Sequence, residues 1–261
     1  MDGTARPLAL VTGGSAGIGL ELAKLLAAGG YELIVTGSSD RTAKAAQDLR
    51  ATGVPVTPVQ SDLSTPEGVA SVVAAVGTRP LDALILNAGI ATGGASFLDM
   101  PLERHLGLID LNIGSTVRLC HALLPNVIAA EGKVLMVSSL SATTPTPYEG
   151  VYGPSKSFMT SFGHGLREEL RGTGVTVTIL HPGATATDFH ARAGMGATGF
   201  GDNSWKNDPA LIARQGYEAM LAEVTSLIGG DAETQQAGED HKRLSEEEKA
   251  RRHAEMARPR R

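Results

Sequence analysis

The amino-acid sequence predicts an α/β protein in which one domain is built on a doubly wound parallel sheet. Short apolar runs alternate with longer helical stretches from the start of the chain to about Leu180. A glycine-rich segment, 12–19, follows the first apolar run directly. Strands that alternate with long helices indicate βαβ crossovers, which give a parallel sheet covered by helices on both faces. The length of 261 residues suits one such domain with a large core.

The apolar runs are the expected strands. The first, 8–12, is continuous in apolar residues and ends in glycines, as expected for a strand buried on both faces. The third is the weakest, because Pro55 flanks it and Pro58 interrupts it. The expected strands are 8–12, 33–36, 56–59, 81–86, 134–137 and 175–180.

Helical spacing fills the stretches between these runs. The first helix places Ile18, Leu22 and Leu25 on one side, and Gly29-Gly30 marks its end. Proline near the start of the third agrees with its preference for the first turn. The expected helices are 17–28, 41–51, 66–76, about 102–130, 154–171 and 209–222.

Two segments depart from this alternation. The glycine-rich stretch after the last strand is expected to hold a substrate loop at about 184–208, since long irregular segments in compact domains are commonly lids or mobile loops. We expect residues 1–230 to form the catalytic domain and 231–261 a charged helical extension, in which Ser245 and Glu248 form a capping box. The extension is expected to be a solvated terminal helix. A second hypothesis is that it covers the active-site mouth of a neighbouring subunit.

Composition excludes several classes of function. A net charge of −5 gives no reason to expect nucleic acid or an anionic membrane as a partner. The single cysteine, Cys120, cannot form an internal disulfide, which favours a reducing cytoplasm. Residues 1–7 lack the apolar core of a signal peptide, and no apolar run approaches the ~20 residues that span a bilayer. The seven histidines show no metal-binding spacing, so no metal is expected.

The glycine-rich segment 12–19 predicts nucleotide binding. It lies between the first strand and the first helix, where glycines let the backbone approach a pyrophosphate. The helix N-terminus supplies N–H donors and positive potential to such a group.

A second segment, 152–156, suggests acid–base chemistry. Tyr152 and Lys156 are four residues apart and share a helix face. A lysine ammonium favours the phenolate, so we expect Lys156 to lower the tyrosine pKa. Pro154 suits the first turn of a helix, which places Tyr152 at its positive end.

Together these features resemble the short-chain dehydrogenase/reductase family, in its short branch. The resemblance rests on the spacing Gly-x-x-x-Gly-x-Gly from Gly13, on Asn87-Ala-Gly89, on Ser139, on Tyr152-x-x-x-Lys156 and on Pro182-Gly183. It covers about Leu8 to Thr187 and implies a Rossmann-like strand order 3-2-1-4-5-6, with a possible seventh strand.

The resemblance also implies the cofactor-binding residues. Those expected at the pyrophosphate and its ribose are Gly13, Ser15, Ile18 and Gly19, and those at the adenine are Asp62 and Leu63. Those expected along the groove and at the nicotinamide end are Asn87, Gly89, Tyr152, Lys156, Pro182, Gly183 and Thr187. Two alternatives stay open: Asp62 as a helix cap near Ser64, and Pro182-Gly183 as a plain turn.

The end of the second strand bears on the choice of cofactor. Family members that prefer NAD usually have Asp at the position of Gly37, where a carboxylate binds the ribose hydroxyl and repels a 2′-phosphate. Ser38, Ser39 and Arg41 can hydrogen-bond a phosphate instead, although Asp40 works against it. We therefore expect NADP(H) rather than NAD(H), and keep an NAD-dependent alcohol dehydrogenase as an alternative.

The resemblance assigns the chemistry to four residues. Tyr152 would exchange the proton with the substrate oxygen, and Lys156 would also hold the nicotinamide ribose. Ser139 would hydrogen-bond the carbonyl oxygen, and Asn112 would hold a water that leads protons to Lys156. The predicted function is hydride transfer between NADP(H) and a ketone or secondary alcohol.

The sequence leaves the substrate and the assembly open. Ser141, Tyr148 and Phe189 are candidate substrate contacts, and the aromatic residues of the substrate loop suggest an apolar wall for a small or medium ketone. A dinucleotide-binding regulator without turnover is the alternative from another class, and a sugar epimerase or dehydratase is disfavoured by length. By resemblance, we expect a homodimer or homotetramer formed through the helices at 102–130 and 154–171.

Overall fold

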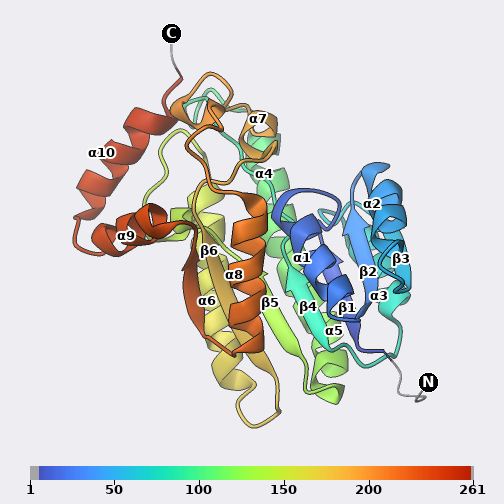
Figure 1. The fold of residues 1–261 in the computed structure, drawn as a ribbon. Helices are drawn as coiled ribbons and strands as arrows, with labels where there is room; N and C mark the ends of the chain where they lie inside the picture. The colour runs from blue at the N-terminus through green and yellow to red at the C-terminus, as the bar shows by residue number, and fades with distance from the viewer. Residues whose placement is uncertain (1–5, 260–261) are drawn as a thin grey trace.

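The computed structural model describes residues 6–259, which form one α/β domain around a seven-stranded parallel sheet (Figure 1). The strand order is β3-β2-β1-β4-β5-β6-β7, so the predicted fold and order are confirmed and the seventh strand is present. The strands are β1 (Leu8–Thr12), β2 (Glu32–Gly37), β3 (Val56–Gln60), β4 (Ala83–Leu86), β5 (Lys133–Val137), β6 (Thr176–Pro182) and β7 (Ser226–Gly229). Residues 1–5 lie outside the described residues, and they make up most of the N-terminal segment in which no signal peptide is expected. Residues 260–261, the last two of the expected extension, also lie outside them.

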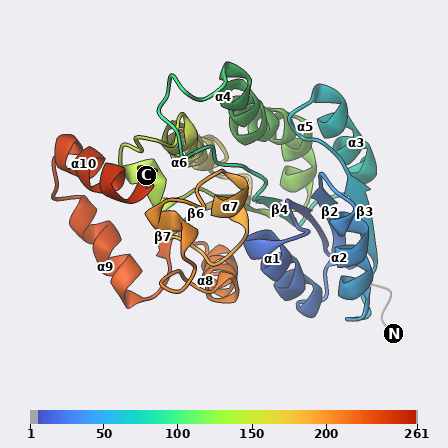
Figure 2. The same ribbon diagram turned by 90° about the horizontal axis from the view of Figure 1, so that it is seen from above.

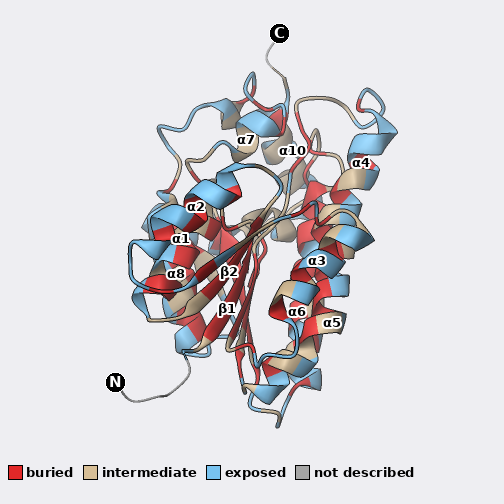
Figure 3. Cartoon of the chain, turned by 90° about the vertical axis from the view of Figure 1, so that its right-hand side faces the viewer, coloured by how far each residue is buried: buried red, intermediate tan, exposed pale blue. Residues whose placement is uncertain are grey.

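Helices cover both faces of the sheet (Figure 2). One face packs against α1 (Gly17–Ala28), α2 (Arg41–Arg50) and α8 (Pro209–Leu221), and the other against α3 (Pro66–Val76), α5 (Ser115–Ala129) and α6 (Tyr152–Glu169). In β1, Leu10 belongs to one core cluster while Ala9 and Val11 belong to the other. This alternation shows why the strand is apolar throughout, because both of its faces are buried (Figure 3).

The weakest expected strand forms at the edge of the sheet. β3 pairs with β2 alone, and Pro58 lies opposite Val35. Proline is tolerated there because an edge strand leaves one side of its backbone without a ladder partner.

The long helical region expected at 102–130 is interrupted. It consists of α4 (Leu102–Ile109), a π-helical turn at Asp110–Gly114, and α5. A π-turn adds a residue to one helical turn and often marks a functional position. Here the turn contains Asn112, which is 1% exposed.

The C-terminal extension folds as α9 (Ala232–His241) and α10 (Glu246–Ala257), and the expected capping box of Ser245 and Glu248 is confirmed. The expectation of a solvated terminal helix is wrong for one face of α10, since Ala257 is fully buried and lies in a core cluster with Tyr152. α9 packs on β7, and α10 packs on the 3₁₀ turn Gly199–Gly201 of the loop that also holds the short helix α7 (Phe189–Arg192) (Figures 1 and 2). Of the helices in residues 6–259, none combines the length and apolar character needed to cross a membrane.

Candidate active site

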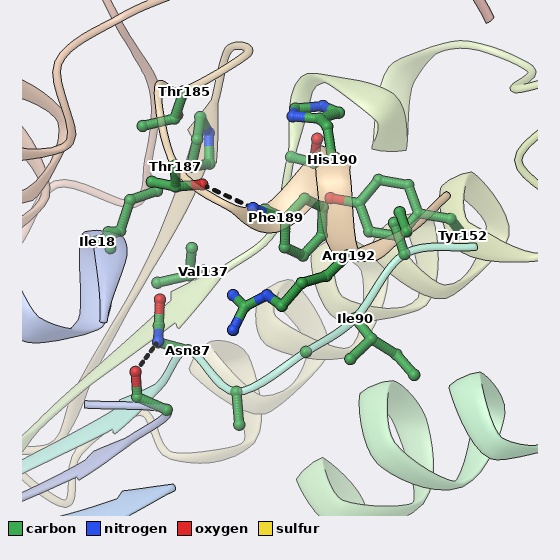
Figure 4. A pocket seen from close by; sticks show the side chains of 18 of the residues that line it. Ile18, Asn87, Ile90, Val137, Tyr152, Thr185, Thr187, Phe189, His190 and Arg192 are labelled. Atoms are coloured by element: carbon green, nitrogen blue, oxygen red, sulfur yellow. Dashed lines mark hydrogen bonds between the residues drawn. The ribbon is translucent and has the colours of Figure 1, made fainter. Parts of the chain in front are cut away.

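A cavity of about 1150 Å³ opens at the carboxyl ends of the strands, beside the neighbouring strands β1 and β4, where the strand order reverses (Figure 4). Most of the predicted site residues line it: Gly13, Ser15, Ile18, Ser38, Arg41, Asp62, Leu63, Asn87, Gly89, Ser139, Ser141, Tyr152, Lys156, Pro182, Gly183, Thr187 and Phe189. Gly19, Asn112 and Tyr148 are not among the lining residues.

The glycine-rich loop presents backbone donors to the cavity. Gly13 and Gly17 have φ values of +63° and +53°, in the left-handed region that glycine adopts without strain. Ala16 precedes α1 and gives it no side-chain cap, so the first N–H groups of the helix are available to an anion. A Cβ at Gly19 would lie 2.3 Å from the Gly13 carbonyl oxygen, so Gly19 lets the helix pack closely on the loop from behind.

Gly37, the last residue of β2, has two side-chain hydroxyls close to the place where a side chain would begin. A Cβ at Gly37 would lie 2.6 Å from Thr42 Oγ1 and 2.7 Å from Ser15 Oγ. Arg41 lies beside the loop after β2, with its guanidinium 3.7 Å from the carboxylate of Asp188 on the opposite wall. Both side chains of this pair are at least half exposed, so it contributes little to stability.

Asp62 is not the cap of α3, because the side chain of Thr65 fills that role by accepting from the Gly68 N–H. Oδ1 of Asp62 accepts hydrogen bonds from the backbone N–H of Ser64 at 2.9 Å and from the Ser64 hydroxyl at 2.7 Å. The residue also lines the cavity together with Leu63.

Asn87 ties the ends of β1 and β4 together. Its Nδ2 donates to the carbonyl oxygens of Thr12 at 2.9 Å and Gly13 at 3.2 Å (Figure 4). The Thr12 hydroxyl in turn accepts from the backbone N–H of Asn87 at 2.9 Å. Thr12 is thus a supporting residue that its place at the end of an apolar run did not reveal.

Tyr152 begins α6, two residues before the expected start. Pro154 therefore lies in the first turn, as its missing N–H allows. The tyrosine is 7% exposed, its ring centroid is 5.6 Å from that of Phe189, and Ser139 lines the cavity beside it. Ser139 Oγ also accepts from the backbone N–H of Ser141 at 3.0 Å. Figure 4 shows the Tyr152 hydroxyl directed into the cavity.

Burial dominates the protonation of this site. It raises the pKa of Tyr152 well above its usual value, against the lowering effect of the hydrogen bond to Ser139, while the charge of Glu149 adds to the rise. The expectation of a lowered tyrosine pKa is therefore wrong, because removing the phenolate from water costs more than its neighbours return. Burial likewise lowers the pKa of Lys156 to about 8.

Lys156 is 5% exposed, and its Nζ lies 5.9 Å from the centre of the Tyr152 ring. It donates a hydrogen bond of 2.9 Å to the carbonyl oxygen of Val137, at the end of β5. That bond fixes the ammonium beside the cavity, one helical turn from the phenol.

Asn112 lies one layer behind the cavity. Its Nδ2 donates to the Ile90 carbonyl oxygen at 2.9 Å and to Ser155 Oγ at 3.0 Å, and its Oδ1 accepts from the Ile90 N–H at 2.9 Å. The amide therefore holds the segment after β4 against α6. The water that the resemblance assigns to Asn112 stays a prediction.

Aromatic side chains form part of the substrate side. Phe189, Phe200 and Trp205 line the cavity, whereas the ring of Tyr148 faces the guanidinium of Arg258 at 5.4 Å. The assignment of Tyr148 to the substrate thus rests on the sequence alone. Within residues 6–259, no cluster of His, Cys, Asp and Glu is arranged to hold a metal.

Several lining residues were not found from the sequence. Arg192 extends from α7 into the cavity (Figure 4). The C-terminal extension contributes Thr234, Ala237, His241 and His253, and the segment before α6 contributes Glu149. None of these belongs to a local motif, so only the tertiary structure reveals them.

Comparisons with known proteins agree with this geometry. Residues 7–196 match the family model described as short chain dehydrogenase. A Rhizobium radiobacter protein named serine 3-dehydrogenase is 34% identical over 207 residues, which cover 78% of this chain and 82% of the relative. A Chromohalobacter salexigens protein named sulfoacetaldehyde reductase is 33% identical over 215 residues, which cover 81% of this chain and 85% of the relative.

Solved structures of similar proteins contain either cofactor. A short-chain dehydrogenase from Sphingobium yanoikuyae in complex with NADPH superposes with a TM-score of 0.77 at 28% identity, covering 85% of this chain and 87% of the other. A 3-oxoacyl-[acyl-carrier protein] reductase from Brucella melitensis in complex with NAD gives 0.75 at 27% identity, covering 88% and 98%.

Proposed function

The chain belongs to the short-chain dehydrogenase/reductase family, and from this premise we propose that it transfers a hydride between NADP(H) and a ketone or secondary alcohol, with Tyr152 as general acid and base. As a member, it is an oxidoreductase that acts on alcohol or carbonyl substrates with a nicotinamide dinucleotide. The observation that carries the finer proposal is that Ser139, Tyr152 and the buried Lys156 line one cavity, with Ser139 close enough to the phenol to influence its pKa.

The residues present fit a dinucleotide. The uncapped start of α1 and the left-handed glycines can receive a pyrophosphate. Asn87, Pro182, Gly183 and Thr187 line the path from that loop to Tyr152. When bound, the nicotinamide supplies the hydride in reduction and accepts it in oxidation.

Ser139 and Tyr152 then act on the substrate oxygen. Because their side chains lie close together in the cavity, one carbonyl oxygen can accept a hydrogen bond from both hydroxyls. The raised pKa of Tyr152 keeps the phenol protonated at neutral pH, which is the state that reduction consumes. In the reverse direction the phenolate takes the alcohol proton, and the Lys156 ammonium favours that charge.

A preference for NADP(H) is supported by the loop after β2. Gly37 supplies no carboxylate to bind the hydroxyls of an unphosphorylated ribose, and side-chain hydroxyls of Thr42 and Ser15 fill the space beside it. Ser38 and Arg41 line the cavity there, and a guanidinium suits a phosphate.

The aromatic wall of Phe189, Phe200 and Trp205 favours an apolar ketone or alcohol of small or medium size. Arg192 favours a second candidate, a short substrate that carries an anionic group, since its guanidinium extends into the same cavity (Figure 4). The names serine 3-dehydrogenase and sulfoacetaldehyde reductase among the relatives agree with the second candidate.

Oligomerisation through α4 and α5 is supported by apolar side chains on their outer surface. Leu102 is 61% exposed, Leu106 is 49% exposed and Val117 is 42% exposed. A row of this kind is typical of a surface covered by a second copy in a homodimer or homotetramer. Sedimentation of the wild type and of Leu106→Glu tests it, with dissociation of the variant expected.

The experiment that tests the enzymatic proposal is a panel of carbonyl compounds and alcohols assayed by nicotinamide absorbance with each cofactor. We expect the enzyme to reduce a carbonyl compound with NADPH and to oxidise the corresponding alcohol with NADP⁺. Tyr152→Phe is the control, because it removes the proton donor and leaves the ring in place.

A further inference from the structure

One wall of the cavity comes from the C-terminal extension of the same chain. Thr234, Ala237 and His241 of α9 and His253 of α10 all line it. A Cβ at Gly183 would lie 2.4 Å from Thr234 Cγ2, so the start of α9 sits against the loop after β6. The extension thus lines the cavity of its own chain, and the second hypothesis, that it covers the active-site mouth of a neighbouring subunit, stays a prediction.

A buried acid–base pair fastens α10 to this wall. Nε2 of His253 donates to Oε1 of Glu149 at 2.8 Å, and the two side chains are 10% and 4% exposed. The partners are 104 residues apart in the sequence. A carboxylate at this depth needs its partner, because a buried charge without one is costly.

Glu149 belongs to the segment that leads directly into Tyr152. The Glu149 carbonyl oxygen accepts from the Tyr152 N–H at 3.1 Å and from the Thr92 hydroxyl at 3.3 Å. Its neighbours Tyr148 and Gly150 have φ values of +67° and +57°. A tyrosine in the left-handed region is strained, so the surrounding contacts must hold this segment in place.

Three other titratable side chains face Glu149. His253 contacts it from α10, and Tyr152 follows it along the chain at the start of α6. The ring of His105, from α4, adjoins the segment, since a Cβ at Gly150 would be 2.6 Å from it. Glu149 raises the pKa of Tyr152, in addition to the larger effect of burial.

On its other side His253 faces both aromatic and cationic groups. Its ring centroid lies 5.6 Å from that of Phe200 in the substrate loop. His241 of α9 is nearby, and burial together with the charges of Lys249, Arg252 and His253 lowers the pKa of His241. His253 therefore connects the substrate loop to the segment before Tyr152.

We propose that His253 is a positioning residue of the active site. Through Glu149 it fixes the segment 148–151, which leads into Tyr152, and it compensates the negative charge of the Glu149 carboxylate beside the phenol. The inference rests on the proposed role of Tyr152 as the proton-transferring group. It gives the C-terminal extension a part in the reaction, although no residue of α10 needs to touch the reacting atoms.

The test compares His253→Ala, Glu149→Gln, the double variant E149Q/H253Q and His253→Gln. For each, kcat and KM of alcohol oxidation are measured across pH by nicotinamide absorbance, with the cofactor Kd and the Tm as checks on folding. The Gln side chain at 253 can still donate to Glu149, and the double variant keeps an amide pair of similar shape without the carboxylate.

The rise of kcat/KM with pH that reflects deprotonation of Tyr152 is called here the tyrosine-dependent limb. Glu149→Gln and His253→Ala are expected to move this limb in opposite directions along the pH axis. Glu149→Gln moves it to lower pH and His253→Ala to higher pH, each by about one pH unit. His253→Ala also lowers kcat by about tenfold or more through misplacement of Tyr152, and His253→Gln restores part of that loss. In the double variant E149Q/H253Q, the limb is expected to lie at the same pH as in Glu149→Gln.

If the His253–Glu149 pair only stabilises the fold, His253→Ala and Glu149→Gln will both lower Tm and leave the pH of the limb unchanged. That result would overturn the inference. A limb that moves the same way in both variants also overturns it. Failure of the proposed function looks different, since Tyr152→Phe would then stay active or the wild type would lack the limb.

Discussion

The side chains of Ser139 and Tyr152 lie close enough in the cavity for Ser139 to influence the pKa of the phenol, although they come from different elements. Ser139 follows β5 and opens a 3₁₀ turn, while Tyr152 begins α6. Both side chains line the same cavity, as required if the two hydroxyls are to hold one substrate oxygen. The catalytic proposal depends on this relationship more than on either residue alone.

Tyr152→Phe should abolish turnover while the cofactor still binds. The substitution removes the hydroxyl that exchanges the proton, and general acid–base catalysis contributes about 10²–10⁴-fold. Quenching of protein fluorescence by NADPH should give a Kd within about twofold of wild type, because the pyrophosphate loop is untouched. Activity retained in the variant would contradict the mechanism.

Lys156→Met should raise stability at neutral pH while it impairs catalysis. Burial lowers the pKa of Lys156 from 10.5 to about 8, so the charged form costs roughly 3 kcal/mol in the folded state. The lost hydrogen bond to Val137 offsets part of this gain. Urea unfolding at pH 7 should therefore show the variant about 1–3 kcal/mol more stable.

The sign of the pH dependence follows from the same shift. Between pH 8 and pH 10.5 the folded wild type has lost the Lys156 proton while the unfolded chain keeps it, so wild-type stability rises through this window relative to the variant. The advantage of Lys156→Met should shrink accordingly as pH increases. A variant that is less stable at pH 7, or a gap that widens with pH, would refute the assignment of a buried ammonium.

Much of the fold could be predicted because its signals are local. The apolar run 8–12 and the glycines after it identify a strand, a loop and a helix without knowledge of any other part of the chain. The π-turn at Asn112 left no such signal, because one extra residue in a helical turn hardly changes the apolar spacing.

In the candidate site, too, the residues with a local signal could be predicted and those brought together by tertiary contacts could not. Tyr152 and Lys156 share a helix face, and their spacing can be seen in the sequence. Glu149 and His253 meet only because α10 folds back across the cavity, and no periodicity records a contact of that range. The protonation of Tyr152 was also misjudged, since the extent of burial is a property of the packed site.

Arg41→Ala should weaken NADPH binding by about tenfold and leave NADH binding nearly unchanged. A guanidinium gains a charge-assisted bond to a 2′-phosphate, worth about 1.5–3 kcal/mol, and has no such partner in NADH. The Kd values of both cofactors should be measured by fluorescence. Lys44→Ala is the matched control, because Lys44 lies exposed on the same helix outside the lining residues. Equal losses for both cofactors in Arg41→Ala would remove the support for NADP(H).

Arg192→Leu should decide between the two substrate candidates. Its guanidinium extends into the cavity that Phe189 and Trp205 also line (Figure 4), so loss of the charge should raise KM for an anionic alcohol or carbonyl compound by about tenfold or more. For a neutral ketone of similar size, KM should change little. Arg192→Lys keeps the charge but not the planar pair of donors, so it should recover part of the loss. The NADPH Kd serves as the control: if it rises in parallel with KM, Arg192 acts on the dinucleotide, and the apolar ketone remains as the substrate that the aromatic wall supports.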